Sequence, residues 1–272
     1  SYLKTLFKNN LITIFQEIRS FPVQNYDVVI NDFEFITAWA CKMRKVPCIG
    51  MGHQASFQSL KTPRPKRREW LGEMILRNYA PCSKAIGFHF DHFDTFIQRP
   101  VIRGEIRQAN ITNKGHYTVY LPAFGDEKLH HYLSQVPHKK WEVFSKFTNE
   151  PYTLDNVHFK PISNTEFIKS FTSCEGILTS AGFETPAEAL YMGKKIFVIP
   201  IKRQYEQFCN AEAMRTMGLP MAKTLNELSL SQIKDWVKFQ EPLSIDYPDV
   251  TRQIIRDEIF SELQKEQPVT VS

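Results

Sequence analysis

The sequence lacks a hydrophobic run long enough to cross a bilayer, and it lacks closely spaced cysteine pairs. Its longest apolar stretches, such as Ile196–Ile201, fall far short of the roughly 20 residues that a membrane-spanning helix needs. The five cysteines are an odd number, and none stands in a C-x-x-C pair. These absences exclude a spanning membrane protein and argue against a disulfide framework or a structural zinc site. We therefore expect a reducing, cytoplasmic environment, and no secretory signal in the polar, basic segment Ser1–Asn10.

The composition is that of a globular protein. Of 272 residues, 42% are hydrophobic and 23% are charged, close to the average of folded domains. These values exclude a disordered, collagen-like or coiled-coil chain. At about 100–200 residues per domain, the length predicts two domains.

Positive charge is concentrated in one segment. The net charge is only +5, yet five cations fall within eight residues, namely Lys61, Arg64, Lys66, Arg67 and Arg68. Pro63 and Pro65 interrupt any helix there, and the charges are too concentrated to be buried. We therefore expect a mobile, solvated loop that binds an anionic partner.

Apolar runs and helical periods alternate in the first part of the chain. An amphipathic helix is expected over Leu3–Ile18, followed by the strands Asp27–Ile30, Val46–Met51 and Lys84–His89 and the helices Phe35–Lys45 and Glu69–Asn78. Strand, helix and strand at this spacing predict a β-α-β unit with a parallel sheet. Because only about three strands are visible and the chain opens on a helix, we expect a first domain that lacks its first strands.

The polar segment Asn110–Gly115 is the expected linker between two domains. The alternation restarts after it with five strands separated by helices, which predicts a complete, doubly wound α/β domain. We therefore divide the chain into residues 1–112 and 113–272. The closing helix Thr251–Lys265 is expected to pack back toward the first domain.

The most informative stretch begins at Gly176, with a predicted strand that runs into Ser180-Ala-Gly182. The residues from Thr185 to Glu188 then have the pattern of a capping box, with proline at the first helical position. A small-residue loop at a helix N-terminus presents backbone N–H groups and a positive dipole end, which suits a phosphate. In the alternative interpretation, Glu188 only caps the helix and the loop is an ordinary connection.

The following segment continues this pattern with Pro200, Glu206, Gln207, Asn210 and Ala211. Together the two parts cover about forty residues and resemble the donor-nucleotide site of GT-B type glycosyltransferases. The likeness is greatest to the peptidoglycan N-acetylglucosaminyltransferase group. It implies an α/β fold with two Rossmann-like, doubly wound domains and a glycosyltransferase of the hexosyltransferase type.

The resemblance also implies which residues bind the donor, which is expected to be a UDP sugar. Glu188 would hold the ribose hydroxyls. The other implied contacts are Ser180, Gly182, Phe183, Glu184 and Thr185 at the diphosphate, Gly125 at a second diphosphate contact, Glu206 and Gln207 at the sugar, and the backbone of Ile162 at the base. No cofactor and no metal are implied, because enzymes of this fold neutralise the diphosphate with helix dipoles. The alternative is a metal site at His89–Asp94, which offers histidine and carboxylate ligands.

The likeness extends more loosely into the first domain, through Tyr26–Ile30 and then Val46–Gln54. The match is partial, since Ala55 stands where the family has asparagine. The resemblance implies that His53 and Gln54 face the interdomain cleft near the acceptor, with His53 standing in for the catalytic base. The alternative is a polar strand end that points to solvent.

By the same resemblance, the basic segment belongs to the acceptor domain. Lys66, Arg67 and Arg68 would then meet anionic lipid head groups or an acidic acceptor, in a protein peripheral to the inner face of the membrane. The segment has no interleaved aromatic residues and no recognised nucleic-acid module, so we expect no nucleic-acid partner. A flexible cleft loop is the alternative.

The expected reaction is transfer of a sugar from a nucleotide-diphosphate sugar to a hydroxyl of a sugar or lipid-linked acceptor. Two other functions stay open at this point. One is a nucleotide-sugar hydrolase or 2-epimerase on the same scaffold, and the other is a non-catalytic nucleotide-sugar-binding protein.

Overall fold

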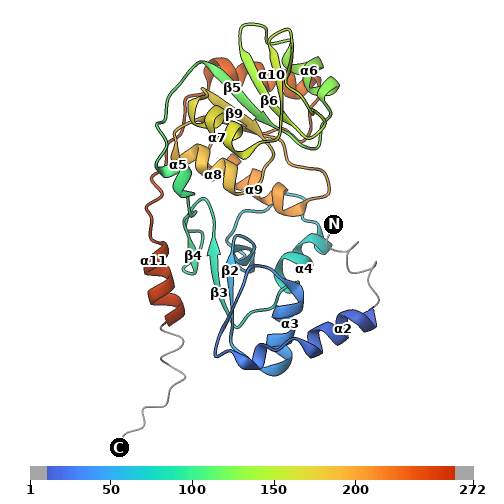
Figure 1. Cartoon of the computed structure of the whole chain (residues 1–272), viewed down its shortest axis with the longest axis vertical. Coiled ribbons are helices and arrows are strands. Elements are labelled where there is room, and N and C mark those ends of the chain that lie inside the picture. The colour runs from blue at the N-terminus through green and yellow to red at the C-terminus, as the bar shows by residue number, and fades with distance from the viewer. Residues whose placement is uncertain (1–10, 261–272) are drawn as a thin grey trace, which may run out of the picture. The chain divides into compact units, whose positions relative to one another are not determined.

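The computed structural model describes residues 11–260, and the chain divides into two compact units. The first unit runs to Val101 and also contains the segment from Pro248, and the second unit is Ile102–Tyr247. Each unit combines helices with its own largely parallel sheet (Figure 1). The expected α/β fold with two Rossmann-like parts is confirmed.

In the described part of the first unit, four parallel strands form a sheet in the order β1-β2-β3-β4. The strands are β1 (Val29–Asn31), β2 (Cys48–Gly52), β3 (Lys84–Phe88) and β4 (Ile97–Gln98). The helices are α2 (Leu11–Ser20), α3 (Phe35–Arg44) and α4 (Trp70–Asn78), with 3₁₀ turns η1 (Val23–Asn25) and η2 (Gln54–Gln58). The predicted strand-helix-strand unit is present as β1, α3 and β2, whereas the short strand β4 was not predicted.

Local chemistry sets both ends of α3. The Glu34 carboxylate accepts hydrogen bonds from the N–H groups of Ile36 and Thr37, at 2.8 and 2.7 Å. Lys45 adopts the left-handed conformation with φ of 58° and ends the helix. α2 and α3 share a buried apolar cluster with β2, which fixes the strand that leads into His53 and Gln54.

The second unit is built on a sheet of six described strands in the order β10-β9-β5-β6-β8-β7. Its strands are β5 (His116–Tyr120), β6 (Lys140–Ser145), β7 (Tyr152–Leu154), β8 (Val157–Pro161), β9 (Gly176–Thr179) and β10 (Lys195–Val198). Its helices are α5 (Gly104–Arg107), α6 (Asp126–Leu133), α7 (Asn164–Ser173), α8 (Glu184–Tyr191), α9 (Tyr205–Thr216) and α10 (Glu227–Phe239). The predicted parallel strands are all present, and β7 adds an antiparallel edge strand that the sequence did not reveal.

Alternation along the strands separates the two faces of this sheet. Tyr117 and Val119 of β5 point into a buried cluster with Trp141 of β6 and Trp236 of α10. Thr118, between them, points to the other face and hydrogen-bonds Ser170 of α7 at 2.8 Å. Helices therefore cover both faces, and the strand ends stay available for loops.

The expected linker Asn110–Gly115 belongs to the second unit in this structure. The N–H of Thr112 donates to the carbonyl of Thr172 at 3.1 Å, and that of Lys114 donates to Ser173 at 2.8 Å. Lys194, which is buried, donates from Nζ to the carbonyl of Thr112 at 2.5 Å. These bonds hold the polar segment against α7, so the division lies at residues 101 and 102 and not at residue 112.

From Pro248 onward the chain belongs to the first unit again. A division into 1–112 and 113–272 does not include this return. The described part of the closing segment is α11 (Thr251–Ile254) followed by a π-helical turn, η3 (Ile255–Phe260). Nζ of Lys84 in β3 lies 2.9 Å from the carboxylate of Glu258. The rest of the expected helix Thr251–Lys265, and the beginning of the expected helix Leu3–Ile18, lie outside the described residues.

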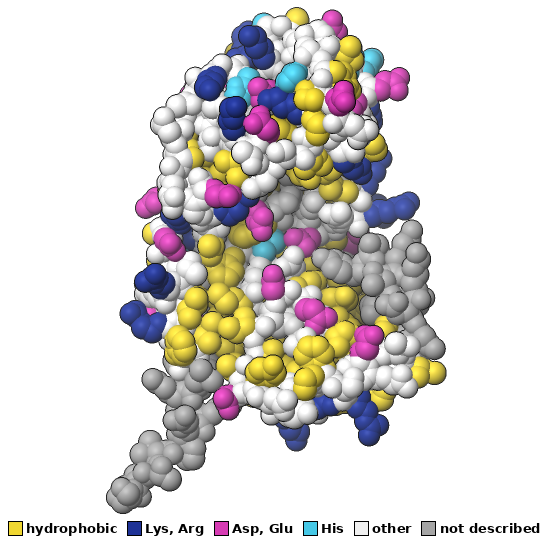
Figure 2. Space-filling view, viewed as in Figure 1, with side chains coloured by type: hydrophobic (Ala, Val, Ile, Leu, Met, Phe, Trp, Pro, Cys, Tyr) yellow, Lys and Arg dark blue, Asp and Glu magenta, His cyan; other side chains and the backbone are white. Residues whose placement is uncertain are grey.

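The surface of the first unit carries several hydrophobic side chains. Figure 2 shows them gathered over the side of this unit that holds β3 and β4. A hollow of about 460 Å³ lies there between Ile86, Phe96 and Glu258. Among residues 11–260, no helix combines the length and the apolar character that a membrane crossing demands.

Candidate functional site

The sheet of the second unit has a point where the chain reverses its direction of winding. From β5 the chain adds β6 and β8 on one side, and later it adds β9 and β10 on the other. Crevices that bind ligands lie outside the carboxyl ends of the strands at such a point. Here these ends are Tyr120 and Thr179, which are paired in register, and the N–H of Ser180 donates to the carbonyl of Tyr120 at 3.2 Å. The loops that carry Gly125 and Ser180–Glu184 therefore start side by side.

The helix after the second of these loops starts two residues earlier than the sequence pattern predicted. α8 begins at Glu184 with Phe183 as its N-cap, and this N-cap contributes no side-chain hydrogen bond in the described structure. The predicted capping box from Thr185 to Glu188 is therefore wrong, because Glu188 lies in the second turn, beyond reach of the first N–H groups. The N-terminus of α8 follows the carboxyl end of β9 and presents backbone N–H groups and the positive end of its dipole there.

Glu188 has a different partner. Its two carboxylate oxygens accept hydrogen bonds from Nε and Nη2 of Arg103, at 2.6 and 2.8 Å. Its side chain is buried, and hydrogen bonding to this carboxylate raises the pKa of Arg103. Arg103 cannot be recognised from the sequence, because 85 positions separate it from Glu188 and neither neighbourhood signals the pairing.

Two glycines of the predicted site have open space where a side chain would stand. A Cβ added to Gly125 or Gly182 would meet no described atom within 4 Å. By contrast, a Cβ at Gly176 would come within 2.8–2.9 Å of Lys195 and Tyr117. Packing explains the glycine at Gly176 alone, whereas Gly125 and Gly182 leave room for a ligand to approach the backbone.

α9 anchors the loop Ser180–Glu184, which follows β9. Nδ2 of Asn210 donates to the carbonyl of Ala181 at 3.2 Å, and Asn210 is fully buried. Gln207 is used within the protein, since its Oε1 accepts from the N–H of Ile201 and its Nε2 donates to Gln204, at 2.9 and 2.8 Å. Gln207 therefore orders the loop before α9. Glu206, its neighbour, is half-buried.

The loop that carries Gly125 is also anchored, by a carboxylate at the start of α6. Asp126 follows Gly125 as the first residue of α6 and accepts hydrogen bonds from Ser145, Thr148 and Tyr152. This fixes Gly125 at the start of α6, next to the end of β6. Ile162 lies exposed between β8 and α7, at the same edge of the sheet but two strands from β5.

In the first unit, His53 follows β2 and is the N-cap of η2. Its Nδ1 lies 2.8 Å from the carbonyl oxygen of Phe88, which can only accept, so Nδ1 carries the proton. The acceptor lone pair of the neutral ring is then on Nε2. The side chain is 8% exposed and packs edge-on against Phe57 and His89. The alternative of a strand end pointing to solvent is wrong for His53.

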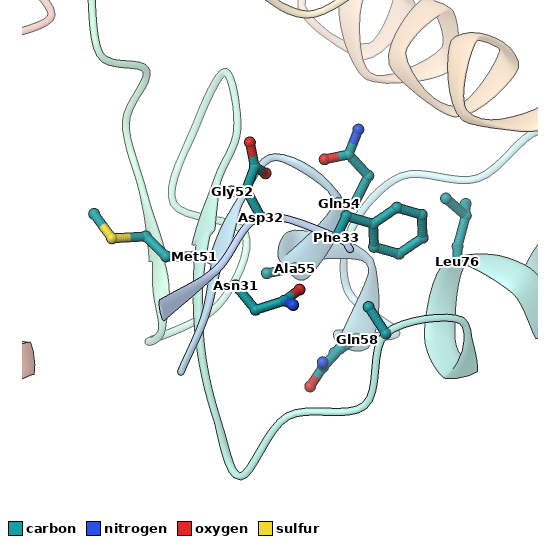
Figure 3. A pocket seen from close by; sticks show the side chains of 10 residues that line it. Asn31, Asp32, Phe33, Met51, Gly52, Gln54, Ala55, Gln58 and Leu76 are labelled. Atoms are coloured by element: carbon teal, nitrogen blue, oxygen red, sulfur yellow. The ribbon is translucent and has the colours of Figure 1, made fainter. Parts of the chain in front are cut away.

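Gln54 lines a small hollow at the carboxyl ends of β1 and β2, together with Asp32 and Phe33 (Figure 3). The hollow has a volume of about 10 Å³, which suits a single water molecule. A Cβ at Gly52 would come 2.2 Å from Oδ1 of Asp32, so any larger residue there would displace the Asp32 carboxylate from its present position. Asp32 is an exposed carboxylate at this edge, and it belongs to no motif by which the sequence would reveal it.

The basic segment is partly buried, contrary to the sequence-based expectation. The side chain of Arg64 is 4% exposed, lies 2.7 Å from the Glu73 carboxylate and donates to the carbonyls of Thr62 and Phe57. Lys61 pairs with Asp94 at 2.9 Å. Arg64 can be buried because its several N–H donors all find acceptors. Lys66, Arg67 and Arg68 are exposed as expected.

The segment His89–Asp94 does not converge on a common centre. His89 is buried and its Nδ1 accepts from the N–H of Phe90, while Asp94 accepts from Ser59 and Lys61. These bonds, with burial opposing them slightly, lower the pKa of Asp94 to about 2. Among residues 11–260, no group of three or more histidine, cysteine or acidic side chains is arranged to hold a metal ion.

The sequence of residues 3–240 matches the family described as Glycosyl transferase family 1. No match was found among curated proteins. These residues include both the crevice of the second unit and the edge of the first unit that carries His53.

Solved structures share this architecture at low sequence identity. The crystal structure of the glycotransferase of kitacinnamycin has a TM-score of 0.54 at 12% identity, over 83% of this chain and 70% of that one. Arabidopsis thaliana UGT89C1 complexed with UDP-L-rhamnose has a TM-score of 0.53 at 11% identity, over 85% and 68% of the two chains. LpCGTa in complex with UDP has a TM-score of 0.54 at 10% identity, over 81% and 69%. At these identities the likeness concerns the fold.

Proposed function

Because the chain belongs to glycosyl transferase family 1, we propose that it transfers a sugar from a UDP sugar to a hydroxyl of its acceptor. It is a GT-B glycosyltransferase, and the proposal concerns the donor, the acceptor and the residues that act on them. The observation that carries it is the pairing of β5 and β9 at the point where the strand order reverses, with Glu188 on the helix that follows β9.

The donor nucleotide is proposed to bind in this crevice of the second unit. The diphosphate would lie against the loop Ser180–Thr185 and the start of α8, with Gly125 at a second contact. The open space over Gly125 and Gly182 supports a close approach of the ligand to the backbone. Glu188 would accept hydrogen bonds from the two ribose hydroxyls, because a carboxylate offers two oxygens and several lone pairs. Two of the solved structures of similar fold are complexes with UDP-L-rhamnose and with UDP.

To accelerate the reaction, the protein must stabilise the charge that develops on the leaving diphosphate. As the bond from the anomeric carbon to the diphosphate breaks, negative charge grows on the diphosphate and positive charge on the sugar ring. Fixed N–H dipoles at the N-terminus of α8 would stabilise that developing charge without reorganising. Glu206 is proposed to reach the sugar hydroxyls. Gln207 would act by holding the loop before α9, since its amide is already hydrogen-bonded.

His53 is the proposed catalytic base. The hydrogen bond from Nδ1 to Phe88 fixes the tautomer whose Nε2 accepts a proton, which is the requirement for deprotonating an acceptor hydroxyl. Gln54 and the exposed carboxylate of Asp32 lie at the same edge of the sheet and are proposed to contact the acceptor.

The acceptor is proposed to be lipid-linked, as in the peptidoglycan N-acetylglucosaminyltransferase group, whose donor-site pattern this sequence resembles. The first unit supports this with three exposed cations, Lys66, Arg67 and Arg68, which Glu69 separates from an exposed tryptophan. Trp70 is 76% exposed and opens α4, which suits an aromatic ring at a lipid interface beside anionic head groups. The protein would then bind the cytoplasmic face of the membrane peripherally.

The test separates donor binding from turnover with two single substitutions. Glu188→Gln should weaken UDP binding by about 1.5–3 kcal/mol, the worth of hydrogen bonds to a charged group, when affinity is measured by calorimetry. His53→Gln should leave UDP binding unchanged and lower the rate of sugar transfer about 10²–10⁴-fold. The rate is measured as sugar release from a panel of UDP sugars, with and without lipid-linked acceptors.

Glu212→Gln is the matched control, since it removes a carboxylate paired with an arginine on the surface of α9. It should change neither quantity. Equal UDP affinity of the Glu188→Gln and unchanged chains would refute the donor site. Sugar release that does not increase with any acceptor would favour a hydrolase.

A further inference from the structure

The carboxylate proposed for the donor ribose is covered by an arginine in this structure. The side chain of Glu188 is 2% exposed, whereas that of Arg103, which binds both of its oxygens, is 39% exposed. The guanidinium therefore lies between the carboxylate and solvent. Each oxygen can accept a further hydrogen bond, but the guanidinium stands on the side of the carboxylate that faces solvent, so a ribose that arrives from solvent meets the arginine before the oxygens.

Arg103 precedes a short helix that other contacts hold against α8. Arg107, one turn further along α5, donates from Nη2 to the carbonyl of Tyr247 at 2.7 Å, and its guanidinium lies over the ring of Tyr191 at 5.1 Å. Tyr191 stands one turn after Glu188 on α8. Arg103 and Arg107, one turn apart, therefore contact Glu188 and Tyr191, which are also one turn apart. Through Arg107, α5 stays in place when the side chain of Arg103 turns away.

Arg103 also has polar and acidic neighbours other than Glu188. Nη1 lies 3.4 Å from the amide oxygen of Asn164, and the charges of Glu184 and Glu105 also act on the guanidinium. Being partly exposed, Arg103 is also within reach of water. Its release from Glu188 therefore leaves no buried, unpaired charge on the arginine.

We propose that Arg103 is a displaceable cover on Glu188 and thereby sets the affinity of the protein for the nucleoside diphosphate. On donor binding, the two ribose hydroxyls replace the guanidinium on the carboxylate. This inference rests on the proposed donor role of Glu188.

The size of the effect follows from how often the pair is open. A site that is competent for only a fraction of the time binds its ligand with an affinity lowered by that fraction. If the pair is closed about nine-tenths of the time, its removal strengthens binding roughly tenfold. The effect is confined to ligands that carry ribose hydroxyls.

The experiment is calorimetry on the full chain with two nucleotides, UDP and 2′,3′-dideoxy-UDP. Arg103→Ala is expected to bind UDP roughly tenfold more tightly and to bind the dideoxy compound as before. Arg103→Lys should bind UDP with an affinity between those of the unchanged chain and Arg103→Ala, because an ammonium group cannot hold both oxygens in a planar fork. Arg215→Ala is the matched control, since it removes an arginine that binds both oxygens of Glu212, and it should change neither affinity.

Thermal melts establish which variants are folded, and Arg103→Lys carries the test if Arg103→Ala does not fold. Unchanged or weaker UDP binding by the Arg103 variants overturns the proposal, and so does an equal gain for both nucleotides. A native chain that binds both nucleotides equally well overturns the donor role of Glu188 itself. That second result is recognised without any Arg103 variant, so the two failures are distinct.

Discussion

At the scale of single residues, the second unit contains an ion cluster at the amino edge of its sheet, opposite the crevice. Glu175 accepts hydrogen bonds from Tyr117, Lys139 and Lys195, at 2.7, 2.8 and 3.0 Å. Burial raises the pKa of Glu175, but the hydrogen bonds from these three side chains outweigh it and lower the pKa to about 2. The pKa of Tyr117 is raised, by burial first and then by its bond to Glu175. This cluster ties β5, β9 and β10 together where they begin.

The cluster predicts a pH-dependent contribution to stability. A carboxyl pKa of about 2 in the folded state lies below the value of about 4.3 expected when unfolded, so ionised Glu175 stabilises the fold at neutral pH. Glu175→Gln should lower the free energy of unfolding by about 1–2 kcal/mol at pH 7. The difference should shrink as the pH falls from about 4.3 toward 2.

The measurement is a series of urea titrations of both chains from pH 7 to pH 3. Glu166→Gln removes an exposed carboxylate that lies 3.9 Å from its lysine partner and should have no effect. A Glu175→Gln deficit that is the same at pH 7 and pH 3 would assign the loss to packing and not to charge.

At the scale of elements, α4 and the segment before it contain two kinds of side chain: some form ion pairs within the first unit, and others are exposed to solvent. Arg64 and Lys61 bind acidic partners within the first unit, through Glu73 and Asp94. The next three cations point outward and are followed by a helix whose exposed side includes Trp70 and Met74, four residues apart. Cations beside exposed apolar side chains are typical of segments that bind an anionic lipid surface.

Replacing Lys66, Arg67 and Arg68 with serine should therefore reduce binding to anionic vesicles. At about 1 kcal/mol per cation, the affinity should fall by roughly two orders of magnitude at low salt, and the loss should shrink as salt screens the charges. Co-sedimentation with vesicles of mixed neutral and anionic lipid measures it. The matched control replaces three exposed lysines of the second unit, Lys169, Lys223 and Lys234, with serine. If both triple variants bind alike at every salt concentration, the first unit carries no lipid-binding surface.

At the scale of the whole molecule, the second unit has what an independent domain requires. It has its own sheet of six described strands and a buried cluster that joins this sheet to α6 and α10. The segment Ile102–Lys114 is part of it, because Arg107 binds Tyr247 and Lys194 binds Thr112. A domain that is cut at residue 113 loses both contacts.

We therefore expect the fragment 102–247 to fold alone and to bind UDP with the affinity of the full chain. The fragment 113–247 should melt at a lower temperature, because it loses α5 and leaves the buried Lys194 with one acceptor fewer. Circular dichroism melts and calorimetry with UDP compare the two. Equal melting temperatures would contradict the boundary, and a folded 102–247 that does not bind UDP would contradict the proposed site of the donor.

The sequence determined the order and type of most elements, because these follow from local patterns. Apolar runs that alternate with helical periods predicted the parallel strands of the second unit and the β1-α3-β2 unit of the first. The pattern from Gly176 to Ala211 predicted the crevice loop after β9 and the helix that bears Glu188. Such features depend on residues within a few positions of one another, so they can be read along the chain.

The tertiary structure alone decided which side chains meet across long separations. It pairs Arg103 with Glu188, buries Arg64 against Glu73 and binds the supposed linker to α7. It also adds β7, whose short, exposed and partly polar sequence carries no strand period. None of these follows from periodicity, because a charged side chain is equally compatible with solvent and with a buried partner until the path of the chain brings an acceptor within hydrogen-bond distance.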